Sequence, residues 1–439
     1  MSIVITIILL QFYLSFFLVD RKTKLMLFFV YTICLQGVKS PYLPFNNVYY
    51  AFLLSELPYL GKHIKSTKKT ILPFLMALIL GGTFVLFLNS PHYEGFTGFA
   101  YLFTYNMLLR YMILCYVFMC FRSMEDLTII YKGFFFSILI LTFFGLTCFI
   151  FKEDFFMRIV NPDNVGFYES HGEDMSITRY GSVGMQGHPS MYGIICVFAS
   201  LFTQYGRDSG WLDRHRFLIL MACCIFGILV CGSRSVLFSF LFGYLSYFAI
   251  TKDTIIKIRY TVLATICLVV ACAFIPYFRN ILEMVTSLFD SKTELGGSSI
   301  DMRLEQFASV WYYIKDDIMF GRGMDFFMLD MGWGENGVST LLDKSLWGLE
   351  GVYLVMILER GLFGFVVYLL FWGCLLFFFY RRRSEMPEMS GLGVSVILSY
   401  LCFSFMTGEL VSYFLTFLIV GLCVSIAYQQ VDHRFSQIG

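Results

Sequence analysis

The sequence contains few charged residues. Asp, Glu, Lys and Arg make up 14% of its 439 residues, and 58% of the residues are hydrophobic, with a mean hydropathy of +0.72. A soluble domain has roughly 25% charged and 45–50% apolar residues. This scarcity of charge excludes an ordinary soluble domain and indicates a protein that spans a membrane repeatedly.

The motifs of several common functions are missing as well. There is no P-loop and no glycine fingerprint that follows a strand, so a pump driven by ATP hydrolysis in this chain is not predicted. The net charge is only +1, and no basic or aromatic motif for nucleic acid occurs, so no nucleic-acid partner is expected. An internal repeat of the kind that organises many transporters is also missing.

Cysteine is present, but not in the pattern of a disulfide framework. The thirteen cysteines lie almost entirely inside apolar runs, and the two longest polar loops, 152–187 and 279–350, contain none. We interpret these cysteines as small apolar packing residues. No disulfide, no metal and no cofactor is predicted.

Apolar runs of span length recur from end to end of the chain. They predict an all-α polytopic membrane protein, a single integral membrane domain over 1–439 with about 13 transmembrane helices. The 351–380 run is too long for one straight span and contains Glu359, Arg360 and Gly361, so we expect a partly buried helix that leads into a span. The predicted spans are 2–19, 25–39, 46–60, 71–89, 98–121, 133–151, 188–206, 217–232, 235–250, 261–278, 351–380, 393–408 and 411–428.

Basic residues cluster on one side of these spans. Under the positive-inside rule that side is cytoplasmic, so the N-terminus is predicted outside and the C-terminus inside. The loops 152–187 and 279–350 then both lie outside. The basic clusters are 21–24, 61–69, 207–216, 251–259 and 381–383, together with Arg122, Lys132 and Arg434.

One arginine stands alone between two apolar runs, in "CGSRSVLFSFLFGY" (231–244). Arg234 is predicted on a tight turn at the external membrane face, and two interpretations stay open. It is an interfacial side chain that extends to lipid phosphates, or it belongs to an anion-binding site together with the exposed N–H groups of the Gly-Ser turn.

A second arginine precedes "GSVGMQGHPSMYGII", which leads from the external loop 152–187 into a span. Pro189 suits the first helical turn. A helix N-terminus favours negative charge, to which Arg179 would add a bidentate contact. We interpret His188 mainly as an ordinary cap or surface residue, with an accessory role in the site as the alternative, because one histidine makes no metal site.

The large external loop, 279–350, contains a predicted amphipathic helix near 299–315. This helix is expected to lie on the outer membrane surface. Its candidate anion-binding residues are Arg303 near its start and Arg322 in the following turn "FGRG", with a solvated face as the alternative position for Arg303. The apolar positions that follow helical spacing are Leu304, Phe307, Val310, Trp311 and Ile314.

A fourth stretch, "LWGLEGVYLVMILERGLFGFVVYLL" (346–370), brings the chain from the external loop back into the membrane. Glu350 lies at that point, external and beside a glycine, and is the candidate for chemistry. Glu359 and Arg360 would be costly at membrane depth unless they are paired or face a polar cavity. A structural ion pair at a helix break is the simpler interpretation of these two residues.

Together these stretches, over roughly 179–370, resemble the O-antigen polymerase and O-antigen ligase superfamily of bacterial inner-membrane enzymes. The motifs that carry the resemblance are "RYGSVGMQGHP", "GSRS", an arginine helix that ends in "FGRG", and "EGVYLVMILERGLFG". Ligases of this superfamily typically carry a histidine at the head of the last motif, where this chain has Glu350. That departure favours a polymerase over a ligase.

The resemblance implies a glycosyltransferase that joins undecaprenyl-pyrophosphate-linked repeat units of a surface polysaccharide at the periplasmic face. Glu350 would serve as the catalytic base. The expected partners are the lipid-linked oligosaccharide, membrane lipids and, as a further candidate, a chain-length regulator protein. The residues that would bind the pyrophosphate oxygens are Arg179, Arg234, Arg303 and Arg322.

Two other functions stay open. An O-antigen ligase would differ only in its acceptor, which is lipid A core. A lipid-linked oligosaccharide flippase is a transporter without covalent chemistry, and it would line a cavity at the membrane midplane with charge. The isolated arginines of this chain favour the external face instead, which argues against a flippase.

Overall fold

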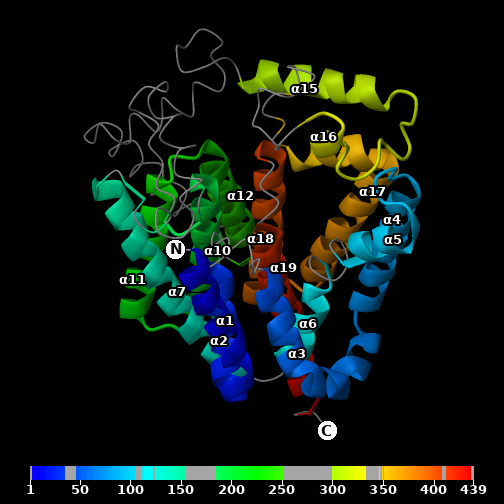
Figure 1. Cartoon of the computed structure of the whole chain (residues 1–439). Helices are drawn as coiled ribbons and strands as arrows, with labels where there is room; N and C mark the ends of the chain where they lie inside the picture. Colours follow the sequence, from blue (N-terminus) through cyan, green and yellow to red (C-terminus); the bar gives the residue numbers. More distant parts are fainter. Residues whose placement is uncertain are drawn as a thin grey trace.

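A computed structural model of the chain consists of helices and their connections (Figure 1). It describes residues 2–34, 46–104, 111–121, 124–151, 153, 154, 156, 184–186, 188–251, 299–332, 346, 349, 351–407 and 412–436. No strand occurs within these ranges. The prediction of an all-α protein is therefore confirmed for the described part of the chain.

The helices follow the predicted apolar runs closely but extend beyond several of them. In chain order they are α1 (Ser2–Leu18), α2 (Arg21–Cys34), α3 (Asn46–His63), the 3-10 helix η1 (Ile64–Lys69), α4 (Leu72–Leu88), α5 (Gly95–Leu102), α6 (Ile113–Cys120), α7 (Met124–Phe151), α10 (Pro189–Asp208), α11 (Arg214–Val230), α12 (Arg234–Thr251), α15 (Ser299–Ile314), the short α16 (Phe326–Leu329), α17 (Val352–Arg381), α18 (Pro387–Met406) and α19 (Ser412–Ser436).

Several helices have the length and apolar character of membrane spans. Among the described residues there are four, Glu125–Phe151, Arg234–Thr251, Val352–Arg381 and Pro387–Met406, or up to five if Ala51–Lys69 and Leu72–Leu88, bent by 94°, count as one. The predicted number of about thirteen is not confirmed, and the predicted span 261–278 lies outside the described residues. Exposed apolar side chains line the outer helices, as on α1 and α4, which suits contact with lipid.

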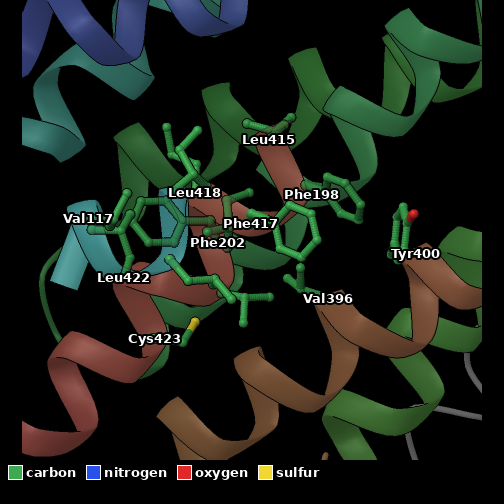
Figure 2. Packing of buried hydrophobic residues seen from close by; sticks show 14 of the residues in the cluster. Val117, Phe198, Phe202, Val396, Tyr400, Leu415, Phe417, Leu418, Leu422 and Cys423 are labelled. Atoms are coloured by element: carbon green, nitrogen blue, oxygen red, sulfur yellow. The ribbon is translucent and has the colours of Figure 1, made fainter. Parts of the chain in front are cut away.

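The core is built around α10, which is buried along almost its whole length. Figure 2 shows Phe198 and Phe202 of α10 packed with Phe417 of α19 and Tyr400 of α18. The ring of Trp372 on α17 stacks on Phe417 with centroids 5.3 Å apart. Because other helices cover α10 along nearly its whole length, it serves as the central element of the bundle.

Charged side chains of three helices meet at one end of the bundle. Arg21 of α2 pairs with Asp126 of α7 at 3.1 Å and lies 3.5 Å from Glu56 of α3, while Lys24 pairs with Glu56 at 3.1 Å. This end also carries η1, the end of α17 and the C-terminus (Figure 1). The predicted basic clusters 21–24, 61–69 and 381–383 thus lie together, as the positive-inside argument requires. α15 and α16 lie at the opposite end.

α17 is broken near its start. Gly361 has φ 59° and ψ −165°, a backbone conformation that is essentially restricted to glycine. The segment 352–360 contacts α15, and the remainder of α17 descends into the bundle (Figure 1). The break predicted at Glu359, Arg360 and Gly361 therefore occurs at the glycine.

Candidate functional site

Arg234 is the first residue of α12 and lies at the end of the bundle that carries α15. α12 runs antiparallel to α18, because its last turn contacts the first turns of α18 and the Oγ of Ser399 donates to the carbonyl oxygen of Ser239 at 2.8 Å. Both helices rise by about 1.5 Å per residue. Continuing this register places Arg234 level with the last turn of α18, which ends at Met406.

The turn before Arg234 is held by close packing against α10. Gly232 has φ 62°, which allows the sharp reversal between α11 and α12. A Cβ on Gly193 of α10 would lie 2.6 Å from the Sγ of Cys231 and 2.8 Å from a methyl group of Val236. The glycine therefore lets α10 approach the turn, and Arg234 is half-buried there on a fixed support.

Arg303 connects α15 to two other helices. Its Nη2 donates to the carbonyl oxygen of Met406 at 2.7 Å, and its Nη1 donates to the Oε1 of Gln306 at 3.1 Å. The same Nη1 lies 3.8 Å from the position that a Cβ on Gly351 would occupy. Arg303 is half-buried and is therefore not on a solvated face.

Arg303 therefore contacts the last turn of α18, and the first residue of α12, Arg234, lies at the level of that turn. The N-termini of α12 and α17 lie at this place too, and the first N–H groups of α17 receive no side-chain cap from Gly351. Helix N-termini and guanidinium groups both favour a negative charge. Glu350, the candidate for chemistry, lies outside the described residues.

Arg322 lies elsewhere, at the far end of α15. Its Nε donates to the carbonyl oxygen of Tyr313 at 2.7 Å, and Tyr313 is about 15 Å along the helix from Arg303. Within the described part of the chain, no hydrogen bond involves the two terminal nitrogens of Arg322. Arg234 and Arg303 therefore both lie at the level of the last turn of α18, whereas Arg322 lies at the other end of α15.

The surroundings of Arg322 form a backbone contact that we call the clasp, made by 318–323 and 358–363. Four backbone hydrogen bonds of 2.9 Å join these two segments: Arg322 and Gly323 donate to Leu358 and Glu359, and Leu362 and Phe363 donate to Ile318 and Met319. The break at Gly361 frees backbone groups of α17, and such groups need partners when they are buried. The clasp supplies those partners and fixes the angle of 352–360 to the rest of α17.

The chain just after the clasp is attached to the loop between α4 and α5. Tyr93 donates to a carboxylate oxygen of Asp325, and the Nε2 of His92 lies 2.8 Å from the carboxylate of Asp330. Burial, and then the hydrogen bond to Asp325, raise the pKa of Tyr93 above its ordinary value. Tyr93 therefore stays a neutral donor. Asp325 has φ 59°, a left-handed conformation that this contact helps to hold.

The remaining predicted site residues have simpler outcomes. His188 caps α10, because its Nδ1 accepts from the backbone N–H of Ser190 at 3.3 Å. Arg179 lies outside the described residues. Gln306, which was not among the predicted site residues, is fully buried beside Arg303. Its spacing of three residues from Arg303, on the same helix face, was the available signal.

The predicted apolar stripe of α15 is divided between two environments. Val310 and Ile314 are buried in a small core with Leu358 of α17. Leu304, Phe307 and Trp311, in contrast, are 62%, 51% and 44% exposed. α15 thus turns Gln306, Val310 and Ile314 toward the rest of the protein and leaves Leu304, Phe307 and Trp311 exposed. That α15 lies on the outer membrane surface stays a prediction.

Comparison with known proteins bears on the same region. No curated protein matches the chain. Residues 219–369 match the family model described as O-antigen ligase. The matched segment runs from α11 to the middle of α17 and contains Arg234, Arg303, Arg322 and Glu350. The chain is therefore similar to the O-antigen ligase family over residues 219–369, which confirms the resemblance to the O-antigen polymerase and ligase superfamily without distinguishing a polymerase from a ligase.

Proposed function

We propose that the protein is a surface polysaccharide polymerase, a glycosyltransferase that joins repeat units carried on undecaprenyl pyrophosphate. The family match supports a role in surface polysaccharide biosynthesis. The position of Arg303 at the last turn of α18, level with Arg234 and beside the N-termini of α12 and α17, is the observation that supports the proposal further. A cationic site of this kind at the membrane boundary suits a lipid-linked pyrophosphate.

The proposed chemistry requires positive charge beside the leaving group, because the leaving group gains negative charge. The oxygen of an acceptor sugar hydroxyl forms a bond to the anomeric carbon of the donor glycan, and the bond from that carbon to the pyrophosphate oxygen breaks. The bonding electrons leave with undecaprenyl pyrophosphate, whose growing negative charge the guanidinium groups of Arg234 and Arg303 stabilise. The sugar–pyrophosphate bond is already activated, so the transfer consumes no nucleotide.

Arg303 is better placed than Arg234 to orient the pyrophosphate. Its hydrogen bonds to Met406 and Gln306 fix the guanidinium plane, and a fixed plane loses little conformational entropy when it binds a phosphate. In the proposal, Arg179 and Arg322 add further contacts to the lipid-linked substrate along the external face. The two terminal nitrogens of Arg322 that form no hydrogen bond in the described part of the chain support such a role.

Glu350 is the proposed base. A sugar hydroxyl is a weak nucleophile, and a carboxylate within hydrogen-bond reach can accept its proton as the new bond forms. Gly351, the next residue, lies beside the guanidinium of Arg303, which supports the placement of Glu350 near the leaving group. The glutamate in place of a ligase histidine favours a lipid-linked repeat unit as acceptor, and lipid A core is the acceptor of the alternative, an O-antigen ligase.

The proposed setting is the bacterial inner membrane, with the site on its periplasmic face. α15 lies at the end of the bundle away from the basic clusters (Figure 1), and the positive-inside rule assigns the basic end to the cytoplasm. Undecaprenyl-pyrophosphate-linked oligosaccharide is the proposed substrate. A chain-length regulator protein is a proposed partner.

An assay with the purified protein, lipid-linked repeat units and lipid A core tests the proposal. We expect undecaprenyl-linked chains of several repeats from the wild type and only the input repeat from Arg303→Lys. The matched control is Arg216→Lys, an exposed arginine at the start of α11, which should retain wild-type polymer. Transfer to lipid A core without any chain extension would establish the ligase and overturn the polymerase.

A further inference from the structure

A second basic surface lies at the end of the bundle away from α15, on the last turn of α3 and on η1. Lys62, Lys65, Lys68 and Lys69 are all exposed. Among the described residues none of the four forms an ion pair or a hydrogen bond through its ammonium group. This differs from the nearby α2, where Lys24 is paired with Glu56. The last turn of α3 and η1 therefore present four positive charges to their surroundings.

The end of α17 adds further positive charge beside η1. The ring of Tyr428 on α19 connects the two: its hydroxyl accepts from the backbone N–H of Ile71 at 3.2 Å, and the guanidinium of Arg382 lies 5.4 Å from its centroid. Arg381 and Arg383 flank Arg382 and are exposed. We call η1 with 62 and 381–383 the basic corner. Glu385 on the α17–α18 connection and Glu388 in the first turn of α18 offset only part of its charge.

Apolar side chains accompany these charges. Ile64 on η1 is 58% exposed, and Leu57, seven residues earlier on α3, is 56% exposed. On α17, Phe377 and Tyr380 are 66% and 50% exposed. The chain bends by 94° between Ala51–Lys69 and Leu72–Leu88. A bend of this kind between apolar helices places η1 at the boundary between lipid and water, where basic and apolar side chains are both stable.

We propose that the basic corner binds the phosphate headgroups of anionic phospholipids, with the exposed apolar side chains of η1 and α17 in contact with the acyl chains. Charge complementarity supports this occupant, because clusters of four or more basic residues next to a membrane span attract anionic lipid. The adjacent apolar residues distinguish a lipid from a soluble anion, which would gain nothing from Ile64. This surface is separate from the site at Arg303 and does not depend on the polymerase proposal.

The test compares two double variants of the full-length protein in mild detergent, with short-chain phosphatidylglycerol as the probe and native mass spectrometry as the readout. Lys68→Gln with Lys69→Gln should bind phosphatidylglycerol about 30-fold more weakly than the wild type, which is ~2 kcal/mol at about 1 kcal/mol per basic residue. Arg214→Gln with Arg216→Gln is the matched control. It removes two exposed charges at the start of α11, beside Asp213, and should bind like the wild type.

Two further arms decide what kind of ligand the basic corner takes. Ile64→Ser should weaken phosphatidylglycerol binding, and inorganic phosphate at equal concentration should not displace the lipid. Phosphatidylcholine should bind the wild type and the lysine variant equally. Equal phosphatidylglycerol binding by the wild type and the lysine variant, an equal loss in the control, or displacement of the lipid by inorganic phosphate would each overturn the proposal.

Discussion

Replacing Gly361 by alanine is the sharpest perturbation of the clasp. The conformation at φ 59° and ψ −165° costs a residue with a Cβ of the order of 1–3 kcal/mol. The added Cβ would also lie 2.5 Å from the carbonyl carbon and oxygen of Met319 and 2.6 Å from the backbone nitrogen of Gly321. These atoms belong to the backbone, so no side-chain rotation can relieve the clash.

The clash must therefore open at least part of the clasp. Each of its four hydrogen bonds contributes about 0.5–1.5 kcal/mol, and losing two of them adds about 1–3 kcal/mol to the backbone strain. We expect a total destabilisation of the order of 2–6 kcal/mol for Gly361→Ala. Because the clasp sets the direction of 352–360, polymer production should fall even where the protein still folds.

Gly373→Ala is the matched control on the same helix. No atom lies within 4 Å of the position that a Cβ on Gly373 would occupy, and alanine in a helix interior is favoured over glycine by about 1 kcal/mol. The assay is thermal unfolding of the purified proteins in detergent, with polymer length measured in cells. A Gly361→Ala protein with the unfolding temperature and polymer length of the Gly373→Ala protein would refute the clasp as a structural determinant.

Three further predictions concern the site and its orientation. Arg303→Lys and Arg234→Lys keep the charge but lose the planar guanidinium group, so each should reduce turnover about 10²–10³-fold in the lipid-linked repeat assay. Wild-type turnover would show that these arginines only contact lipid or protein and do not bind the pyrophosphate. Glu350→Gln should reduce turnover about 10²–10⁴-fold and leave donor binding intact, whereas Glu305→Gln on the exposed face of α15 should have no effect. Cysteines introduced at Ser66 and Ser384 should not react with a membrane-impermeant thiol reagent added outside the inner membrane, whereas a cysteine at Asp330 should react. The opposite result would show that the predicted orientation is inverted.

The sequence predicted local features of this fold well. The apolar runs indicated the helices, and the glycine beside Glu359 and Arg360 indicated the break in α17. Both are properties of a short stretch of chain, so composition and spacing suffice to predict them. His188 could be recognised as a cap for the same reason, because it directly precedes Pro189.

Contacts between distant segments could not be predicted in this way. The clasp joins residues about forty positions apart, and the bond from Arg303 to Met406 spans 103 positions. The spacing of α15 gave its helical period but not which arc faces inward, since Leu304 and Val310 are equally apolar. Only the packing of α15 on α17 decides that Val310 is buried and Leu304 exposed.

The glycan profile of a strain that lacks this protein tests the central claim most directly. If the protein is the polymerase, the strain should carry single repeat units on lipid A core, because transfer to the core continues while chain extension stops. Long undecaprenyl-linked chains that are absent from lipid A would contradict the account, since chain extension would then be intact and the lost step would be ligation.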